Sequence, residues 1–431
     1  MNGQTPIDLV GVWLGYPAPM RGAVSSAAIV CLTLSVLSAQ RPPAAGDPMA
    51  LTNASVLNVR TGAVTRNATV VLRGGTIESV GPGAALAGVR TVDLGNRFVV
   101  PGLIDAHVHI GSLPQMRAAL ESGVTTVRSA GASHYADVGL RELVKRGHVA
   151  GPDMVAAGYH VRPGVAAEIF MDFPELGDLL GPPGVSNAEA IRRIVRANLP
   201  RGVEWIKTNA TERAGTPDTD PRRQLYSQEE LRVLVVEAGA QNIPVMAHAH
   251  GAEGADAAVR AGVRSIEHGT YLTDDTLQMM VKQGTYFDPT VDIVNDLTEP
   301  GGDYDHAGLK RRGEMMLPIL KAAIGKAVKF GVKIVAGSDT GYGPNSIARV
   351  SREVTELVGA GLTPLQALQA ATVTNAEMLR LEKRIGAIEA GLEADVLVVD
   401  SNPLDNIRTL LDPLLVISNG RIGLDRLAFG T

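Results

Sequence analysis

The sequence predicts an α/β protein that consists of a (β/α)8 TIM barrel and a small β-sandwich domain formed from both chain ends. Between residues 102 and 340, eight short apolar runs alternate with helical stretches, which indicates repeated βα units and a parallel sheet. Before residue 103 and after residue 382, short β-type runs are separated by Gly-rich turns. Eight βα units suit a barrel, whereas a doubly wound sheet rarely contains that many strands. We therefore expect the barrel at 103–382 and the sandwich at 49–102 plus 383–431.

The strands expected in the barrel are short and most of them end in polar residues. They read GLIDAHVHI (102–110), VTTVRSAG (124–131), DMVAAGYHV (153–161), EWIKTNA (204–210), PVMAHAHG (244–251), RSIEHGT (264–270), TYFDPTV (285–291) and KIVAGSDT (333–340). A helix is expected over 227–242, where Ser227 and Glu230 have the spacing of a capping box. The β-type segments at the chain ends are each too small to hold a core alone, so we expect them to pair with one another.

Composition excludes some classes of function. The chain has 431 residues, a formal net charge of −5, 45% hydrophobic residues and 20% charged residues, which is ordinary for a globular protein. No basic run is present, so we expect no nucleic-acid partner. A single cysteine excludes an internal disulfide.

The N-terminal segment resembles a secretory signal peptide. Residues 20–40 contain a Met and an Arg, a run of apolar and small residues, and then Leu37-Ser38-Ala39. We expect translation to start at Met20, cleavage to fall near Ala39, and residues 41–48 to form a linker. The run is too short to favour a permanent membrane span, and no other stretch is apolar enough. The prediction is therefore an exported protein, periplasmic or secreted, or a cytoplasmic one if this segment is not a functional signal.

Ligand-type side chains gather at the ends of the expected strands, where the active sites of such barrels lie. The chain has nine histidines in total. The side chains at strand ends are His107, His109, Lys207, His248, His250, His268 and Asp339. Histidine and carboxylate are ligands of zinc and related ions. Asp105, two residues before the first pair, is expected to lie deeper and to orient rather than to bind metal.

Lys207 is the unexpected member, because an ammonium repels a cation and is costly to bury unpaired. Carbamylation by carbon dioxide would convert it into a carboxylate that can bridge two metals. Alternatively, Lys207 could extend toward solvent, which would leave a site with one metal.

The segments VPGLIDAHVH, EWIKTNA, AHAHG, SIEHG and AGSDT together resemble the amidohydrolase superfamily. More narrowly, they resemble its imidazolonepropionase-like and prolidase-like branch, which includes peptidases that release C-terminal amino acids and ochratoxin-degrading amidases. The resemblance covers about residues 50–423, including the closing TVTNAEMLRLEKRIGAIEAGLEADVLVVDSNPL.

The resemblance implies two divalent metal ions, Zn²⁺ by preference, and a hydroxide that bridges them as the nucleophile. It implies that His107, His109, Asp339 and the N6-carboxylated Lys207 bind the first ion. It implies that Lys207, His248 and His268 bind the second. Asp339 would take the proton of the hydroxide and pass it to the leaving amine.

Substrate contacts are less clear from the sequence. His250 shares a strand face with His248, and His160 and Arg162 follow the third strand, where a loop residue could contact substrate. Arg162 could bind a substrate carboxylate, or form an ordinary surface ion pair. Tyr271, just after the SIEHG motif, could donate to substrate or simply pack. The sequence VRSAG after the second strand lacks the acidic residue that the resemblance would place after the Arg.

The sequence therefore predicts a binuclear metal-dependent amidohydrolase. Its expected substrates are N-acyl amino acids or dipeptides with a free C-terminal carboxylate. The alternatives are a mononuclear cyclic-amide hydrolase like imidazolonepropionase, a lactonase or phosphotriesterase, and a non-catalytic binding protein on the same barrel. The resemblance also implies a homo-oligomer.

Overall fold

The structure, a computed structural model, describes residues 48–83 and 88–430. The predicted signal peptide, with its start at Met20 and its cleavage site near Ala39, lies outside these residues. Within them, no helix is both long and apolar enough to cross a membrane.

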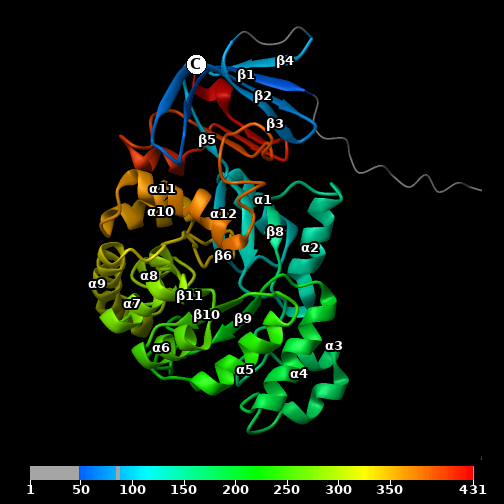
Figure 1. Ribbon diagram of the computed structural model, residues 1–431, viewed down its shortest axis with the longest axis vertical. Coiled ribbons are helices and arrows are strands. Elements are labelled where there is room, and N and C mark those ends of the chain that lie inside the picture. The colour runs from blue at the N-terminus through cyan, green and yellow to red at the C-terminus, as the bar shows by residue number, and fades with distance from the viewer. Residues whose placement is uncertain (1–47, 84–87, 431) are drawn as a thin grey trace, which may run out of the picture. The chain divides into compact units, whose positions relative to one another are not determined.

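Strands from both chain ends form one sheet, with the order β15-β14-β13-β5-β1-β2-β3 and with β4 paired to β1 (Figure 1). These strands are β1 (Met49–Leu57), β2 (Val64–Arg73), β3 (Thr76–Pro82), β4 (Arg90–Asp93), β5 (Phe98–Pro101), β13 (Val396–Val399), β14 (Leu415–Ser418) and β15 (Arg421–Asp425). The ends meet where β5 pairs antiparallel with β13. Backbone hydrogen bonds of Ile77 to Leu392 (2.8 Å) and of Ala394 to Gly75 (2.9 Å) curl the sheet on itself. The curled sheet encloses one hydrophobic cluster from both chain ends.

The predicted (β/α)8 barrel is confirmed. Its regular strands are β6 (Leu103–Val108), β7 (Val124–Ser129), β8 (Asp153–Val155), β9 (Ile206–Asn209), β10 (Val245–Ala249), β11 (Ser265–His268) and β12 (Tyr286–Asp288). They form the parallel groups β6-β7-β8 and β9-β10-β11-β12. Three parallel bridges close the circle, namely Val161 with Thr208, Phe287 with Ile334, and Thr340 with Val108.

The eighth strand, predicted at 333–340, is irregular and contributes only isolated bridges. Asp339 has a left-handed φ of 53°, which departs from the extended backbone of a regular strand. The backbone at Gly337 passes close to Asp288, because a Cβ atom there would lie 2.4 Å from its carboxylate. The segment is nevertheless tied to β6, because Asp339 N–H donates to His107 O at 2.7 Å.

Helices alternate with the barrel strands and surround them (Figure 1). They are α1 (Leu113–Glu121), α2 (Ala136–Lys145), α3 (Ile169–Asp172), α4 (Ala188–Asn198), α5 (Gln228–Gly239), α6 (Ala252–Ala261), α7 (Asp274–Gln283), α8 (Val291–Asp296), α9 (Ala307–Phe330), α10 (Val350–Gly359), α11 (Pro364–Ala370) and α12 (Val373–Leu379). The capping box predicted from Ser227 and Glu230 is present at the start of α5.

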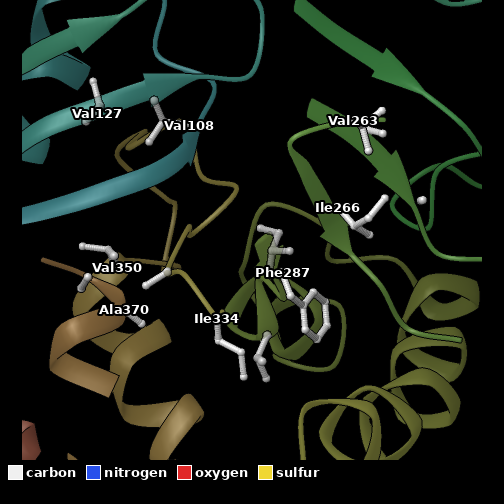
Figure 2. Packing of buried hydrophobic residues seen from close by; sticks show 14 of the residues in the cluster. Val108, Val127, Val263, Ile266, Phe287, Ile334, Val350 and Ala370 are labelled. Carbon is white, nitrogen blue, oxygen red and sulfur yellow. The ribbon is translucent and has the colours of Figure 1, made fainter. Parts of the chain in front are cut away.

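Apolar side chains fill the space between strands and helices. Figure 2 shows Val108, Val127, Ile266, Phe287 and Ile334, which come from five consecutive segments around the barrel. A second apolar cluster lies among the strands themselves and includes Ile104, Trp205, Met246, Tyr286 and Val335. Layers of this kind make the barrel a packed core, so a ligand site is expected only at its mouth.

Candidate metal centre and active site

A cavity of about 330 Å³ lies at the carboxyl ends of the barrel strands. All the side chains predicted to bind metal line it, namely His107, His109, Lys207, His248, His268 and Asp339. They are far apart in the sequence, and the parallel strands bring their ends to one side of the barrel.

The first group of ligand-type side chains is His107, His109 and Asp339. The Nε2 atoms of His107 and His109 lie 3.3 and 3.0 Å from Oδ1 of Asp339. Although burial opposes ionisation, the two histidines and Lys207 hold the pKa of Asp339 well below its usual range. The carboxyl is therefore an anion at neutral pH. Its left-handed backbone is a strained conformation of the kind that is retained at functional sites.

The second group is His248, His250 and His268, whose ring nitrogens lie within 4.8 Å of one another. His268 Nδ1 contacts Thr290 Oγ1 at 2.7 Å, and His250 Nδ1 contacts Thr270 Oγ1 at 2.9 Å. His248 Nε2 lies 3.0 Å from the carbonyl oxygen of Glu212. Because a carbonyl can only accept, this nitrogen carries the proton, and Nδ1 of His248 keeps its lone pair.

Lys207 lies beside both groups and is 2% exposed. Its Nζ is 3.1 Å from Nε2 of His107, and β9 pairs with β10 so that Lys207 lies opposite Met246, two residues before His248. Burial lowers the pKa of Lys207 to about 8, against the attraction of Glu267 and Asp339. An appreciable fraction of the amine is therefore neutral near pH 7.

The donor set fits divalent metal ions. Burial lowers the pKa of His107 to about 4 and that of His250 to about 3, so these rings are neutral at physiological pH. Neutral imidazole and carboxylate are the nitrogen and oxygen ligands that zinc uses. The residues present can therefore hold one ion at His107, His109 and Asp339 and another at His248 and His268, with Lys207 beside both.

A buried charged network lies under the first group, and sequence reasoning missed it. Glu267 Oε2 lies 2.9 Å from His107 Nδ1, and Arg128 Nη2 donates to the same oxygen at 2.8 Å. Although burial alone would raise it, Arg128 and His107 hold the pKa of Glu267 low. The anionic Glu267 therefore accepts the Nδ1 proton of His107 and leaves the Nε2 lone pair facing the cavity. The sequence did contain a signal, because Arg128 and Glu267 are charged residues of opposite sign that lie inside two of the predicted barrel strands.

Asp105 supports the same wall from behind. Its carboxylate accepts hydrogen bonds from Ser338 N (2.9 Å), Ser338 Oγ (2.5 Å) and the Tyr342 hydroxyl (2.8 Å). These bonds join β6 to the segment that carries Asp339, so Asp105 fixes the distance between His107 and Asp339 without lining the cavity itself.

Comparison with known proteins identifies the family. Residues 98–423 match the model of the amidohydrolase family. The chain belongs to the amidohydrolase family.

Proteins similar to this amidohydrolase include an ochratoxinase, a Xaa-Pro dipeptidase and a prolidase. The chain is 29% identical to ochratoxinase from Aspergillus niger over 397 residues, which cover 81% of each protein. The solved structure of a Xaa-Pro dipeptidase with bound methionine in its active site superimposes with a TM-score of 0.78 at 27% identity, covering 87% of this chain and 99% of that one. A prolidase complexed with N-methylphosphonate-L-proline has a TM-score of 0.74 at 27% identity, with the same coverage. The predicted superfamily and its prolidase-like and ochratoxinase branches are confirmed.

The amidohydrolase site also contains residues of the βα loops. His160 and His250, which the sequence suggested as substrate contacts, line the cavity. Arg162 instead lines a smaller pocket of about 140 Å³ that shares His160, and Tyr271 is half-buried outside the cavity lining.

Four polar lining residues were missed, namely Asn209, Arg213, Asp303 and Tyr304. Asn209 lies two residues after Lys207 on β9. Because side chains alternate along a strand, the sequence could have indicated that Asn209 faces the same side as Lys207. Nothing in the sequence marked the other three, because they lie on loops.

Proposed function

We propose that this amidohydrolase is a binuclear metal-dependent enzyme that cleaves the amide or peptide bond of N-acyl amino acids or dipeptides with a free C-terminal carboxylate. The observation that carries the proposal is the buried Lys207 beside two groups of ligand-type side chains. A mononuclear site would gain nothing from a lysine there, and a cation among metal ligands would be unfavourable.

In the proposed site, the ligand-type side chains are divided between two ions. His107, His109 and Asp339 would hold one ion, His248 and His268 would hold the other, and the N6-carboxylated Lys207 would be shared by both. When bound, the ions, which we take to be Zn²⁺, polarise the scissile carbonyl and activate a water molecule. Asp339 is anionic and lies at the metal-binding wall, so it is placed to accept the proton of that water and to deliver it to the leaving amine.

Carboxylation of Lys207 is chemically accessible. The neutral amine attacks carbon dioxide, the new N–C bond forms, and a proton is released to leave a carbamate anion. Burial favours this step, because it lowers the pKa of Lys207 to about 8 and so raises the fraction of nucleophilic amine. The carbamate replaces a positive charge with a negative one between the two sets of ligands.

The substrate class is supported by the relatives and by the cavity. One structural neighbour holds methionine and another a phosphonate of proline, so both bind groups derived from an amino acid. A cavity of about 330 Å³ suits a compound of the size of a dipeptide or an acyl amino acid.

The test is a hydrolysis screen over N-acyl amino acids and Xaa-Pro dipeptides, with a cyclic amide, a lactone and a phosphotriester included for comparison, and with metal content measured on the same sample. We expect about two equivalents of metal per chain and hydrolysis of at least one member of the panel. Asp339→Asn, purified in parallel, controls for contaminating hydrolases. One equivalent of metal per chain with activity only on cyclic amides would favour the imidazolonepropionase-like alternative. Activity only on lactones or phosphotriesters would favour a lactonase or phosphotriesterase. Less than one equivalent with no hydrolysis would favour a non-catalytic protein.

We also propose that the protein is exported, on the basis of the signal-peptide pattern at residues 20–40. Expression of the full chain followed by N-terminal sequencing of the exported fraction tests this. A mature terminus near Gln40 is expected, and an uncleaved cytoplasmic chain would contradict it. Light scattering on the mature protein tests the expected homo-oligomer.

A further inference from the structure

Arg213 differs from the other charged groups of the cavity. It lies on the loop after β9, is exposed, and lines the cavity together with the predicted metal ligands. Among the described residues, no carboxylate lies within 4.0 Å of its guanidinium, and its one polar contact is the Tyr304 hydroxyl, 3.4 Å from Nη2. Most arginines near the site are already paired, as Arg222 is with Asp220 at 2.9 Å. Arg213 therefore presents an unused set of donors to the cavity.

The loop that carries Arg213 is held in place from α9. The Arg312 guanidinium donates to the carbonyl oxygens of Ala214 (2.6 Å), Thr216 (2.7 Å) and Thr219 (2.6 Å). These bonds fix both the residue after Arg213 and the far side of the loop. A group fixed in this way loses less entropy when it binds a ligand.

Tyr304 completes the arrangement. Its ring packs against Gly215, where a Cβ atom would lie only 2.6 Å from Cε1. Burial raises the pKa of Tyr304 to about 12, so the hydroxyl keeps its proton and can donate. Asp303, the adjacent acidic residue of the lining, accepts from Ser346 Oγ at 2.7 and 2.9 Å and does not neutralise Arg213.

Arg213 supplies a positive charge at the loop side of the cavity. Its guanidinium lines the cavity, and Asp303, the acidic residue of the lining next to Tyr304, accepts from Ser346 instead of pairing with Arg213. A cation that is not neutralised by the protein favours an anionic group of a ligand at this side of the cavity.

We propose that Arg213, together with the Tyr304 hydroxyl, binds the C-terminal carboxylate of the substrate and so gives the enzyme a preference for substrates in which this carboxylate is free. Arginine suits this role because its planar fork matches the two oxygens of a carboxylate. This inference rests on the proposed function. It assigns the carboxylate to Arg213 rather than to Arg162, the arginine that the sequence suggested. Arg162 lies in the neighbouring pocket and has a buried Nε without a partner among the described residues.

The experiment compares an N-acyl amino acid that the wild-type enzyme cleaves with its C-terminal amide, in wild type, Arg213→Met, Arg162→Met and Arg222→Met. We expect Arg213→Met to lower kcat/KM for the acid roughly 10- to 100-fold, mainly through KM, because a charged hydrogen bond is lost. Cleavage of the amide is expected to change little, so the preference for the acid falls by the same factor. Arg222→Met removes an equal charge from the same loop and is the matched control.

Two further variants sharpen the assignment. Arg213→Lys keeps the positive charge but lacks the paired donors of the guanidinium, so we expect it to retain only part of the wild-type activity on the acid. Tyr304→Phe is expected to lose roughly 3- to 10-fold on the acid alone. Metal content equal to wild type verifies that each variant is folded. The inference is overturned if Arg213→Met keeps the full preference for the acid, or if Arg162→Met removes it. Failure of the proposed function would differ, since the wild type would then cleave neither compound.

Discussion

The strand ends and the loops of this site are held in place in different ways. His107 and Asp339 lie on neighbouring segments of the barrel and are joined by a backbone hydrogen bond of 2.7 Å. Beneath His107, Glu267 and Arg128 are fully buried. Arg213, in contrast, is exposed and lies on a loop that is held by side-chain contacts, among them those of Arg312, which lies on a helix and is 98 residues from Ala214 in sequence. If the proposed function holds, the strands position the groups that act on the scissile bond, and the loops position the groups that select the substrate.

Lys207→Ala should have the largest effect, because it removes the proposed bridge between the two ions. We expect kcat to fall by at least about 1000-fold and metal content to fall as well. Bicarbonate with a short carboxylic acid should restore part of the activity, because a free carboxylate can occupy the space of the side chain. Steady-state kinetics with and without these additives measures both effects. Wild-type activity without additives would remove the bridging role.

Glu267→Gln should weaken metal binding roughly 10- to 100-fold without removing any predicted ligand. A neutral amide holds the Nδ1 proton of His107 less strongly than the carboxylate does, so Nε2 becomes a poorer ligand. Competition with a chelator measures the affinity, and circular dichroism verifies the fold. Glu377→Gln, which loses a surface ion pair to Lys333, is the matched control. Unchanged metal affinity in Glu267→Gln would mean that the buried network stabilises the fold of the barrel and does not contribute to metal binding.

Carboxylation of Lys207 should depend on pH in a defined direction. The pKa of its amine is lowered to about 8, chiefly by burial, so the neutral form increases as the pH rises from 7 to 9. Because only the neutral amine attacks carbon dioxide, the initial rate of carbamate formation at fixed dissolved carbon dioxide should increase roughly tenfold over this range. The growth of the carbamate ¹³C NMR signal in metal-free protein with labelled bicarbonate measures this formation, and Lys207→Ala serves as the blank. A signal that is independent of pH would show that the amine is not the titrating group.

The same contrast explains what the sequence could predict. His107 and His109 are two residues apart on a strand, and strand ends in a barrel share one face, so the predicted metal ligands could be brought together without a structure. The pairing of Arg128 with Glu267 joins residues 139 apart, and no local pattern encodes it. The positions of Arg213 and Tyr304 follow from contacts between loops. In loops, neither periodicity nor spacing predicts which way a side chain points. For this reason the sequence suggested Arg162, a conspicuous residue after a strand, for the carboxylate.

Gly215→Ala should have the smallest effect and tests the loop alone. The backbone of Gly215 is not left-handed, so alanine is conformationally acceptable there, and the effect arises from the Cβ atom 2.6 Å from the Tyr304 ring. The ring must shift, and its hydroxyl then no longer lies beside Arg213. We expect KM for the acid to rise about 2- to 5-fold, with kcat and metal content unchanged, because one neutral hydrogen bond is weakened. Gly177→Ala, where a Cβ meets nothing within 4 Å, is the control. A fall in kcat with KM unchanged would instead indicate that Tyr304 acts on the scissile bond, and the separation between strand chemistry and loop specificity would then fail at this residue.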